Sequence, residues 1–400
     1  MIKRRIQSIK ENKNLAIIGL IAVVNALGYG IIIPIIYSYS QKFGLTDFQN
    51  GLLFALFSLC SFIATPFIGR LSDKYGRKPL LVASIVGTTV SFVMAAFAPS
   101  ALILFLARAL DGITAGNIPV ASAVISDTTL PKDRAKGFGI IGAAFGFGFV
   151  FGPAISAATV GFGLHVPFLI AAGISLLAVF ITYFFLPETN KHIGQVSEGK
   201  IFDFPKMARA VVDPNVGLTL LISLIYNVAL GMFIFAFQPF SVKVLHMSPN
   251  QIALLFTLFG VIGLITQLFI LQRAVRFFGE KKAFSIALAI SAISYLLIFF
   301  TTSINIFLAI IVLSGLANSF VAPLVQTLLS KETDEKSQGS IQGINASYVS
   351  LGNIMGPIIA GVLATAYLPL PFLISSFVIL VCLVLSFSVM KKNAPKEHLF

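Results

Sequence analysis

Residues 139–153 read GIIGAAFGFGFVFGP, and residues 343–357 read GINASYVSLGNIMGP. Both stretches carry the same spacing of three glycines and a proline: Gly139, Gly148, Gly152 and Pro153, then Gly343, Gly352, Gly356 and Pro357. The two copies are 204 residues apart, and neither contains a charged residue. An apolar helix that occurs twice in one chain indicates two similar membrane-embedded halves, an arrangement typical of transporters.

The composition is that of a membrane protein. Of the 400 residues, 57% are hydrophobic and 11% are charged, whereas a soluble domain carries about 25% charged residues. A helix needs ~20 apolar residues to cross the hydrocarbon core. We therefore expect an all-α protein with twelve transmembrane helices, near residues 15–38, 50–68, 79–98, 101–126, 137–160, 166–186, 215–240, 250–271, 282–301, 304–329, 341–366 and 370–390.

The chain divides in its middle. We predict an N-terminal segment (1–14), a six-helix bundle (15–186), a middle loop (187–214), a second six-helix bundle (215–390) and a tail (391–400). Beyond the glycine–proline stretch, Gly76 and Gly112 recur 203 residues later as Gly279 and Gly315. The middle loop contains an amphipathic segment, 201–212, that we expect along the inner membrane surface.

The positive charges lie on one side of the predicted membrane. The net charge is +13, and 25 of the 28 lysines and arginines fall in the terminal segments and in alternate loops. Only Lys42 and Lys243 fall in the other loops, and Arg108 lies inside a span. This asymmetry places both termini in the cytoplasm of a cell whose inner (plasma) membrane holds the protein, and it argues against a nucleic-acid-binding role.

The sequence contains no motif that brings together residues for metal binding or catalysis. Cys60 and Cys382 lie in apolar stretches, and the four histidines fall in loops or the tail. No glycine-rich phosphate loop with a following Lys-Ser/Thr is present. We therefore predict neither an enzyme nor an ATP-driven pump, and we expect no cofactor and no metal.

The loop after the second span reads GRLSDKYGRK over residues 69–78. This motif resembles the signature of the major facilitator superfamily, with Lys74 in place of arginine. In that family the motif forms a cytoplasmic gate that holds the halves together, and its arginine pairs with an acid at the inner end of the fourth helix. The resemblance implies gate residues Gly69, Asp73, Gly76, Arg77, Lys78 and Asp127. It also implies that Asp73 meets the helix beginning near Gly339.

The second half lacks this gate motif. Leu271 and Arg276 stand where the glycine and the aspartate would be. We therefore expect the gate on the first half only.

The glycine–proline stretch also resembles the antiporter motif of drug/proton exporters in this superfamily. Small residues recur every four positions at Ala144, Gly148, Gly152 and Ser156, which lets another helix approach closely. Pro153 removes a backbone hydrogen bond and bends the helix. The family motif ends in two glycines, whereas this chain has Ser156 and Ala157. A tight helix contact with no bearing on transport direction is the alternative interpretation.

The fourth span contains two ionisable residues, Arg108 and Asp111. Three residues apart on a helix, they share a face and can pair. Ionisable residues inside a membrane are costly and are functional candidates by default. Burial favours a neutral carboxyl and a neighbouring arginine favours a carboxylate, so Asp111 can be poised to exchange a proton. The alternative is a permanent ion pair that only fixes the helix.

Runs such as 28–34, 142–148 and 329–339 resemble tetracycline/proton antiporters most closely. That family carries tetracycline as a metal chelate and uses aspartates in helices one, three and nine. Alignment on neighbouring motifs puts Asn25, Ser91 and Ser291 there, and none of these can titrate. Members usually act as monomers. The resemblance implies proton-coupled export of a small lipophilic compound. That family has a small uncharged residue where this chain has Asp111, so either the proton site has moved to the fourth helix, with Asp111 carrying the proton and Arg108 tuning it, or coupling has been lost.

Neutral polar residues remain to line a substrate cavity in apolar surroundings, which suits a lipophilic ligand. The candidates are Asn25, Tyr29, Asn117, Tyr226, Asn227, Gln238, Gln267, Asn318, Gln326, Asn345 and Tyr348. Two other functions stay open. One is an uncoupled facilitator or importer of a small metabolite, and the missing aspartates favour it. The other is a non-transporting membrane sensor or assembly partner, and the presence of the gate motif argues against it.

Overall fold

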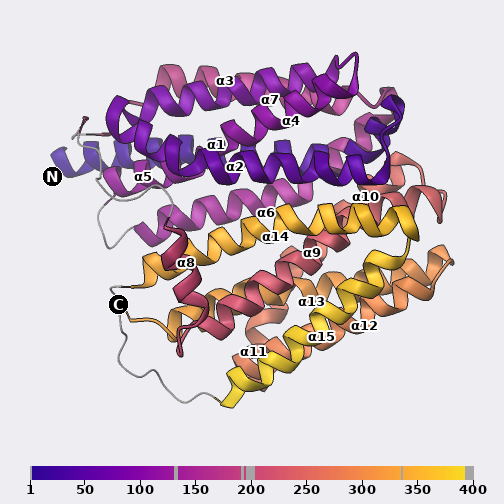
Figure 1. Ribbon diagram of the computed structural model, residues 1–400. Coiled ribbons are helices and arrows are strands. Elements are labelled where there is room, and N and C mark those ends of the chain that lie inside the picture. Colours follow the sequence, from indigo (N-terminus) through magenta and orange to yellow (C-terminus); the bar gives the residue numbers. More distant parts are fainter. Residues whose placement is uncertain (1, 130–133, 191–192, 195–202, 335–336, 392–400) are drawn as a thin grey trace. The chain divides into compact units, whose positions relative to one another are not determined.

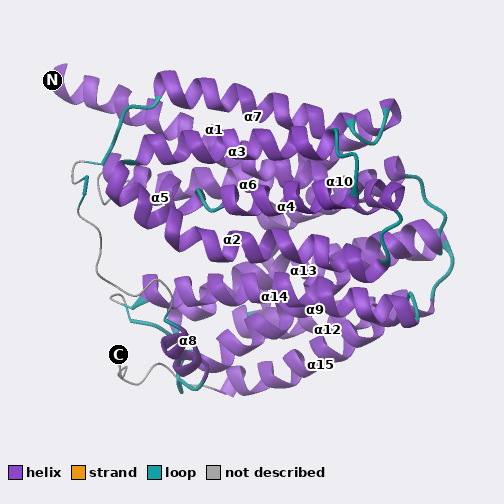
Figure 2. Ribbon diagram, turned by 45° about the horizontal axis from the view of Figure 1, so that its top comes forward, coloured by secondary structure: helices purple, strands orange, loops and turns teal. Residues whose placement is uncertain are grey.

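The computed structural model describes residues 2–129, 134–190, 193–194, 203–334 and 337–391, and helices make up most of this part (Figures 1 and 2). The tail beyond residue 391 and much of the middle loop lie outside the described residues. The helices before the middle loop are α1 (Ile2–Ser40), α2 (Asp47–Tyr75), α3 (Arg77–Ala96), α4 (Ala101–Ala115), α5 (Ile118–Thr128), α6 (Arg134–Thr159) and α7 (Val166–Phe185). Later helices are α8 (Phe204–Val211), α9 (Gly217–Lys243), α10 (Pro249–Ile265), α11 (Leu271–Phe278), α12 (Glu280–Phe300), α13 (Ile304–Lys331), α14 (Gln338–Ala366) and α15 (Leu370–Lys391).

Twelve helical segments in the described part are long and apolar enough to cross a membrane. This confirms the predicted all-α fold with twelve spans. Each predicted apolar run corresponds to one of these segments, although the helices often extend several residues beyond the run.

Two spans are interrupted where the sequence analysis predicted continuous helices. The fourth span is broken at Gly116 and Asn117, between α4 and α5. Pro119 follows in the first turn of α5, where it has no N–H with which to continue the helical ladder. The eighth span changes to a π-helical turn over Thr266–Ile270, between α10 and α11. Such interruptions often mark functional positions in membrane helices.

The internal contacts of the chain define two compact units. Unit 1 comprises Met1–Gly44, Leu59–Ile201 and Ser248–Thr257, and unit 2 comprises Leu45–Ser58, Phe202–Met247 and Leu258–Phe400. The first part of α2 thus groups with unit 2, and the first part of α10 groups with unit 1.

The same packing scheme occurs in both units. In unit 1, α1 packs against α6 and α7, and α3 packs against α7 and α4. In unit 2, α9 packs against α14 and α15, and α12 packs against α15 and α13. The spans formed by α1 and α9 are the most buried in the chain, with 72% and 61% of their apolar windows inside. Each unit is therefore organised around its first long helix.

The repeated glycines mark the place where this helix crosses its main partner in unit 1. A Cβ on Gly30 of α1 would meet the Gly148 carbonyl oxygen at 2.5 Å and the Cα of Gly152 at 3.2 Å. A Cβ on Gly152 would in turn meet the Cα of Gly30 at 2.8 Å. Because no side chain separates them, the backbones of α1 and α6 lie in direct contact.

Unit 2 contains the same crossing between α9 and α14. A Cβ on Gly231 would meet the Gly352 carbonyl oxygen at 3.1 Å and the Cα of Gly356 at 3.3 Å. A Cβ on Gly356 would meet the Cα of Gly231 at 2.8 Å. The first glycines of the two stretches, Gly139 and Gly343, have no such neighbour within 4 Å. The close contact thus involves only the last two glycines of each stretch.

Valine in place of Gly148 or Gly352 should force the crossing helices apart. Overpacking of this kind costs ~1–3 kcal/mol, so both variants should unfold at a lower temperature in detergent. Gly139→Ala and Gly343→Ala are matched controls, because their added methyl groups meet no neighbouring element. Equal midpoints for the valine variants and the controls, measured by thermal unfolding of the purified protein, would contradict the crossing.

Candidate functional site

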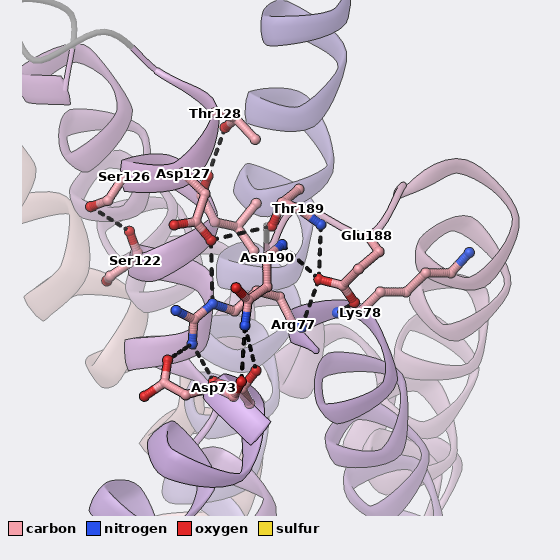
Figure 3. Close-up of polar contacts among 12 residues, drawn as sticks. Asp73, Arg77, Lys78, Ser122, Ser126, Asp127, Thr128, Glu188, Thr189 and Asn190 are labelled. Carbon is pink, nitrogen blue, oxygen red and sulfur yellow. Dashed lines mark hydrogen bonds and ion pairs between the residues drawn. The ribbon is translucent and has the colours of Figure 1, made fainter. Parts of the chain in front are cut away.

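Arg77, at the start of α3, joins three helices of unit 1 (Figure 3). Its Nη1 lies 2.6 Å from Asp73 Oδ1 at the end of α2, and its Nε donates to Asp127 Oδ2 at 3.3 Å at the end of α5. Nη1 also donates to Ser72 Oγ at 2.6 Å. The Arg77 side chain is 13% exposed, so water screens these contacts only in part.

Glu188 completes this cluster, and sequence reasoning did not identify it. Its Oε1 accepts a hydrogen bond from the Arg77 amide at 2.9 Å, and its Oε2 accepts one from the Lys78 amide at 3.1 Å (Figure 3). These first amides of α3 have no partner inside the helix. A carboxylate is also favoured at the positive end of the helix dipole. Glu188 therefore fixes the end of the sixth span to the beginning of α3.

Gly76 leaves the space that Glu188 occupies. Its φ of 103° is unfavourable for other residues, and a Cβ there would collide with the Glu188 carboxylate. Asn190, two residues after Glu188, also ties this segment to α2, because its side-chain amide donates to the Asp73 carbonyl oxygen at 3.1 Å. Of the other predicted gate residues, Lys78 places its Nζ 5.5 Å from the Tyr183 ring, and Gly69 has no close neighbour at its Cβ position.

Unit 2 has an ion pair at the corresponding position, with the signs reversed. Glu280 is the first residue of α12, as Arg77 is of α3, and it lies 203 residues later. Its Oε2 is 2.7 Å from Lys331 Nζ at the end of α13. The Lys331 side chain is 64% exposed, so this pair is weak. We expected the gate in the first half only. Unit 2 lacks the gate motif, but it has this exposed ion pair at the corresponding helix start.

Arg108 and Asp111 form an ion pair within α4. Arg108 Nη1 lies 2.7 Å from Asp111 Oδ2, and the two side chains are only 6% and 10% exposed. Asp111 is ten residues from the start of α4, or ~15 Å along the helix. The pair lies shortly before the break at Gly116, so a change in its charge acts near a non-helical point of the span.

Several candidate cavity residues hydrogen-bond to one another. Asn25 of α1 donates to Asn117 Oδ1 at 2.9 Å, and the Tyr226 hydroxyl of α9 donates to Asn318 Oδ1 at 3.0 Å. In both pairs the partners are 92 residues apart. The second pair follows the first by 201 residues. Both units therefore contain a polar bridge: from α1 to the fourth span in unit 1, and from α9 to α13, the tenth span, in unit 2.

Asn318 is the centre of a larger polar cluster in unit 2. Besides the Tyr226 hydroxyl, its Oδ1 accepts the Ser291 hydroxyl at 3.0 Å, and its Nδ2 donates to the Tyr295 hydroxyl at 3.0 Å. The Tyr295 ring stacks on Phe233 with centroids 4.5 Å apart. Ser291 is one of the positions at which the resemblance places an aspartate, and here it supports a neutral network.

The remaining candidates take varied positions. Asn345 accepts a hydrogen bond from Ser223 at 2.6 Å, Asn227 donates to the Ser223 carbonyl oxygen, and Tyr348 donates to the carbonyl oxygen of Met207 in α8. Gln238 is buried, whereas Gln267 and Gln326 are exposed. Three of the eleven candidates belong to unit 1 and eight to unit 2. Among the described residues, no group of three or more His, Cys, Asp or Glu could hold a metal ion.

Removing the Glu188 carboxylate should destabilise the start of α3. We expect Glu188→Ala to cost ~1 kcal/mol, as loss of a helix cap does, and Glu188→Gln to cost less because one acceptor oxygen remains. Glu280→Gln is the matched control, since it removes a carboxylate from the start of α12 that contacts the exposed Lys331 side chain and accepts no backbone amide among the described residues. Thermal unfolding in detergent measures all three. A Glu188→Ala protein as stable as the control would refute the capping role.

The two polar bridges should differ in strength. Hydrogen bonds between membrane helices contribute ~0.6 kcal/mol each. Asn318 makes three such bonds and Asn25 makes one, so Asn318→Leu should lower the unfolding midpoint about three times as much as Asn25→Leu. Parallel thermal unfolding of the two variants checks this ratio, and a larger effect at Asn25 would contradict it.

Comparison with known proteins agrees with this architecture. The model of the family described as Major Facilitator Superfamily matches residues 18–238 and 219–400. Among solved structures, the nucleoside transporter NupG superposes with a TM-score of 0.77 at 14% identity, covering 95% of this chain and 100% of that chain. At this identity the likeness concerns the fold alone.

Relatives with closer sequences cover nearly the whole chain. Multidrug resistance protein 2 of Bacillus subtilis is 30% identical over 94% of this chain and 95% of its own length. Tetracycline resistance protein, class C, of Escherichia coli is 30% identical over 94% of this chain and 96% of its own. The chain therefore belongs to the Major Facilitator Superfamily, and it is a multi-pass membrane transporter, not an enzyme.

Proposed function

We propose that this transporter exports a small lipophilic compound by alternating access and couples that export to proton influx. The ion pair of Arg108 and Asp111 is the observation that carries the proposal. Its two charges are almost fully buried within a membrane span, and their side chains are in direct contact. Membrane proteins seldom retain such groups without a functional need, because burying charge in the bilayer is costly.

Protonation of Asp111 gives a physical link to conformational change. A neutral Asp111 no longer attracts the Arg108 guanidinium as a carboxylate does, so the two states of the proton favour different contacts in α4. The break at Gly116 and Asn117 follows within two turns. A change in these contacts can therefore alter the angle between α4 and α5 without straining a continuous helix.

The relatives support export and the class of substrate. Their names describe multidrug, tetracycline and quinolone resistance proteins. Apart from Arg108 and Asp111, the candidate polar groups within the spans, such as Asn25, Asn117 and Asn318, are uncharged. Neutral amides and hydroxyls in apolar surroundings suit a lipophilic ligand with few polar groups. We include tetracycline-like compounds in this class.

The orientation follows from the charge distribution. We place both termini in the cytoplasm, so that the Arg77 cluster lies at the cytoplasmic end of unit 1. There the cluster would act as the gate implied by the signature motif. The two six-helix halves, 15–186 and 215–390, would form the moving parts of a monomer.

A second function, an uncoupled facilitator, is favoured by one observation. Asn25, Ser91 and Ser291 occupy places where the resemblance puts aspartates used for transport. In the structure Asn25 and Ser291 bond to neighbouring amides, and the Ser91 hydroxyl donates to the carbonyl oxygen of Thr88. None of these three can carry a proton, so coupling rests on Asp111.

Proton release from inside-out vesicles tests the coupling. The vesicle interior is made acidic, a panel of lipophilic drugs including tetracyclines is added, and a pH-sensitive dye reports protons that leave. We expect drug-triggered release with the unaltered protein and loss of most of it with Asp111→Asn. Glu280→Gln is the control, because it removes a carboxylate outside the spans' interior and should keep the release.

The outcomes separate the two functions. If Asp111→Asn releases protons as the unaltered protein does, the coupling site is not Asp111. If no drug releases protons while the folded protein still equilibrates a compound across the membrane, the uncoupled facilitator replaces the antiporter.

A further inference from the structure

We propose that α8 is an interfacial helix that binds anionic phospholipid headgroups at the membrane surface beside unit 2. This role is separate from the transport chemistry. The helix is well defined at both ends. Asp203 caps it by accepting a hydrogen bond from the Lys206 amide at 3.0 Å, and Asp213 accepts the amides of Asn215 and Val216 in the turn that leads to α9.

Three faces of α8 have different surroundings, because successive residues on a helix are turned by ~100°. The first face packs on the protein: Ala210 is fully buried, and Met207 and Val211 are half-buried. α8 contacts α9 and α14 there.

The second face is apolar and open. Phe204 is 58% exposed and Val212, directly after the helix, is 79% exposed. Ala208 lies between them on the same face and is also exposed. Beside this apolar face, Lys206 and Arg209 form an exposed basic edge. An apolar face bordered by basic residues is typical of helices that lie in the plane of a membrane.

The depth of α8 agrees with this placement. The Tyr348 hydroxyl of α14 donates to the Met207 carbonyl oxygen at 2.6 Å. Tyr348 lies ten residues from the start of α14, or ~15 Å along it. α14 has 29 residues, so at ~44 Å it exceeds the hydrocarbon core by about 7 Å at each end. With α14 upright and centred in the bilayer, the Tyr348 backbone is about 8 Å inside the hydrocarbon boundary, a depth that the apolar face of an interfacial helix reaches.

The charge of α8 selects the lipid. Lys206 and Arg209 lie on the exposed basic edge of this helix, and their long side chains can reach the headgroups, where each positive charge is attracted to anionic lipid. Zwitterionic headgroups give no comparable attraction. We therefore expect a bilayer that contains phosphatidylglycerol to hold α8 more firmly than one of phosphatidylcholine alone.

Spin labels on the full-length protein in liposomes test this. In a background of Cys60→Ser and Cys382→Ser, single cysteines replace Val212 or Ala208 on the apolar face, or Lys206 on the basic edge. Val384→Cys on α15 is the bilayer reference, and Ser100→Cys, in the exposed loop before α4, is the water reference. Relaxation by oxygen reports exposure to lipid, and relaxation by a water-soluble nickel chelate reports exposure to water.

We expect labels at 212 and 208 to behave like the Val384 reference, and the label at 206 to respond to nickel. Adding Lys206→Glu and Arg209→Glu should shift the 212 label toward the water reference in bilayers with phosphatidylglycerol. Nickel access at 212 and 208 equal to the Ser100 reference would overturn the proposal. Protection of both labels from oxygen and nickel alike would also overturn it, because protein would then cover this face.

A second measurement needs no substitution. A photoactivatable phosphatidylglycerol is incorporated with the unaltered protein, and the cross-linked peptides are identified by mass spectrometry. Cross-links within residues 204–212 support lipid binding at α8. Cross-links on the exposed face of α15 with none on 204–212 would overturn it.

Discussion

In each unit the first long helix crosses its main partner with backbone directly against backbone. This contact positions much of the rest of the structure. Gly30 meets Gly148 and Gly152 in unit 1, and Gly231 meets Gly356 in unit 2. Such a contact admits one register, because a shift by a single residue brings a side chain into the crossing. It thereby fixes the rotation of α1 and α9 about their axes, and with it the helix face on which Asn25, Tyr29 and Tyr226 project.

The extent of burial determines how strongly the charged residues of each ion pair interact. Arg108 and Asp111 interact almost without water, so the state of one strongly affects the other. The Arg77 cluster is intermediate, and it gains strength from hydrogen bonds to backbone amides as well as from ion pairs. The pair of Glu280 and Lys331 is exposed and correspondingly weak. Its reversed polarity is compatible with the repeat, because a surface ion pair joins two helices equally well with either sign.

The spans and the glycine spacing could be predicted from sequence because both depend on local pattern. A run of ~20 apolar residues has few alternatives to a membrane helix, and small residues at intervals of four share one face. The partners of those glycines could not be predicted, since Gly30 and Gly231 lie more than a hundred residues away.

Glu188 was missed for the same reason: its role depends on the approach of the sixth span to the start of α3. Its position directly after a span and near a basic loop was the available signal. The break in the fourth span was also signalled, by Gly116, Asn117 and Pro119, but the apolar run around them concealed it.

The two units differ in the charge of their corresponding spans, the fourth and the tenth. The positions 203 residues after Arg108 and Asp111 are Ile311 and Ser314, and the Ser314 hydroxyl donates to the Ile311 carbonyl oxygen at 3.5 Å. Unit 2 thus satisfies its polar group within the helix, whereas unit 1 holds two opposite charges at the same level. The helix crossing, which depends on shape, and the polar bridge, which depends on neutral hydrogen bonds, recur in both units. The buried ion pair does not recur among the described residues of unit 2, and a pair that served only to fix a helix would be as useful in one unit as in the other. Its restriction to one unit agrees with the proposal of a single proton-exchanging carboxyl, since a second buried acid would add the cost of another membrane charge.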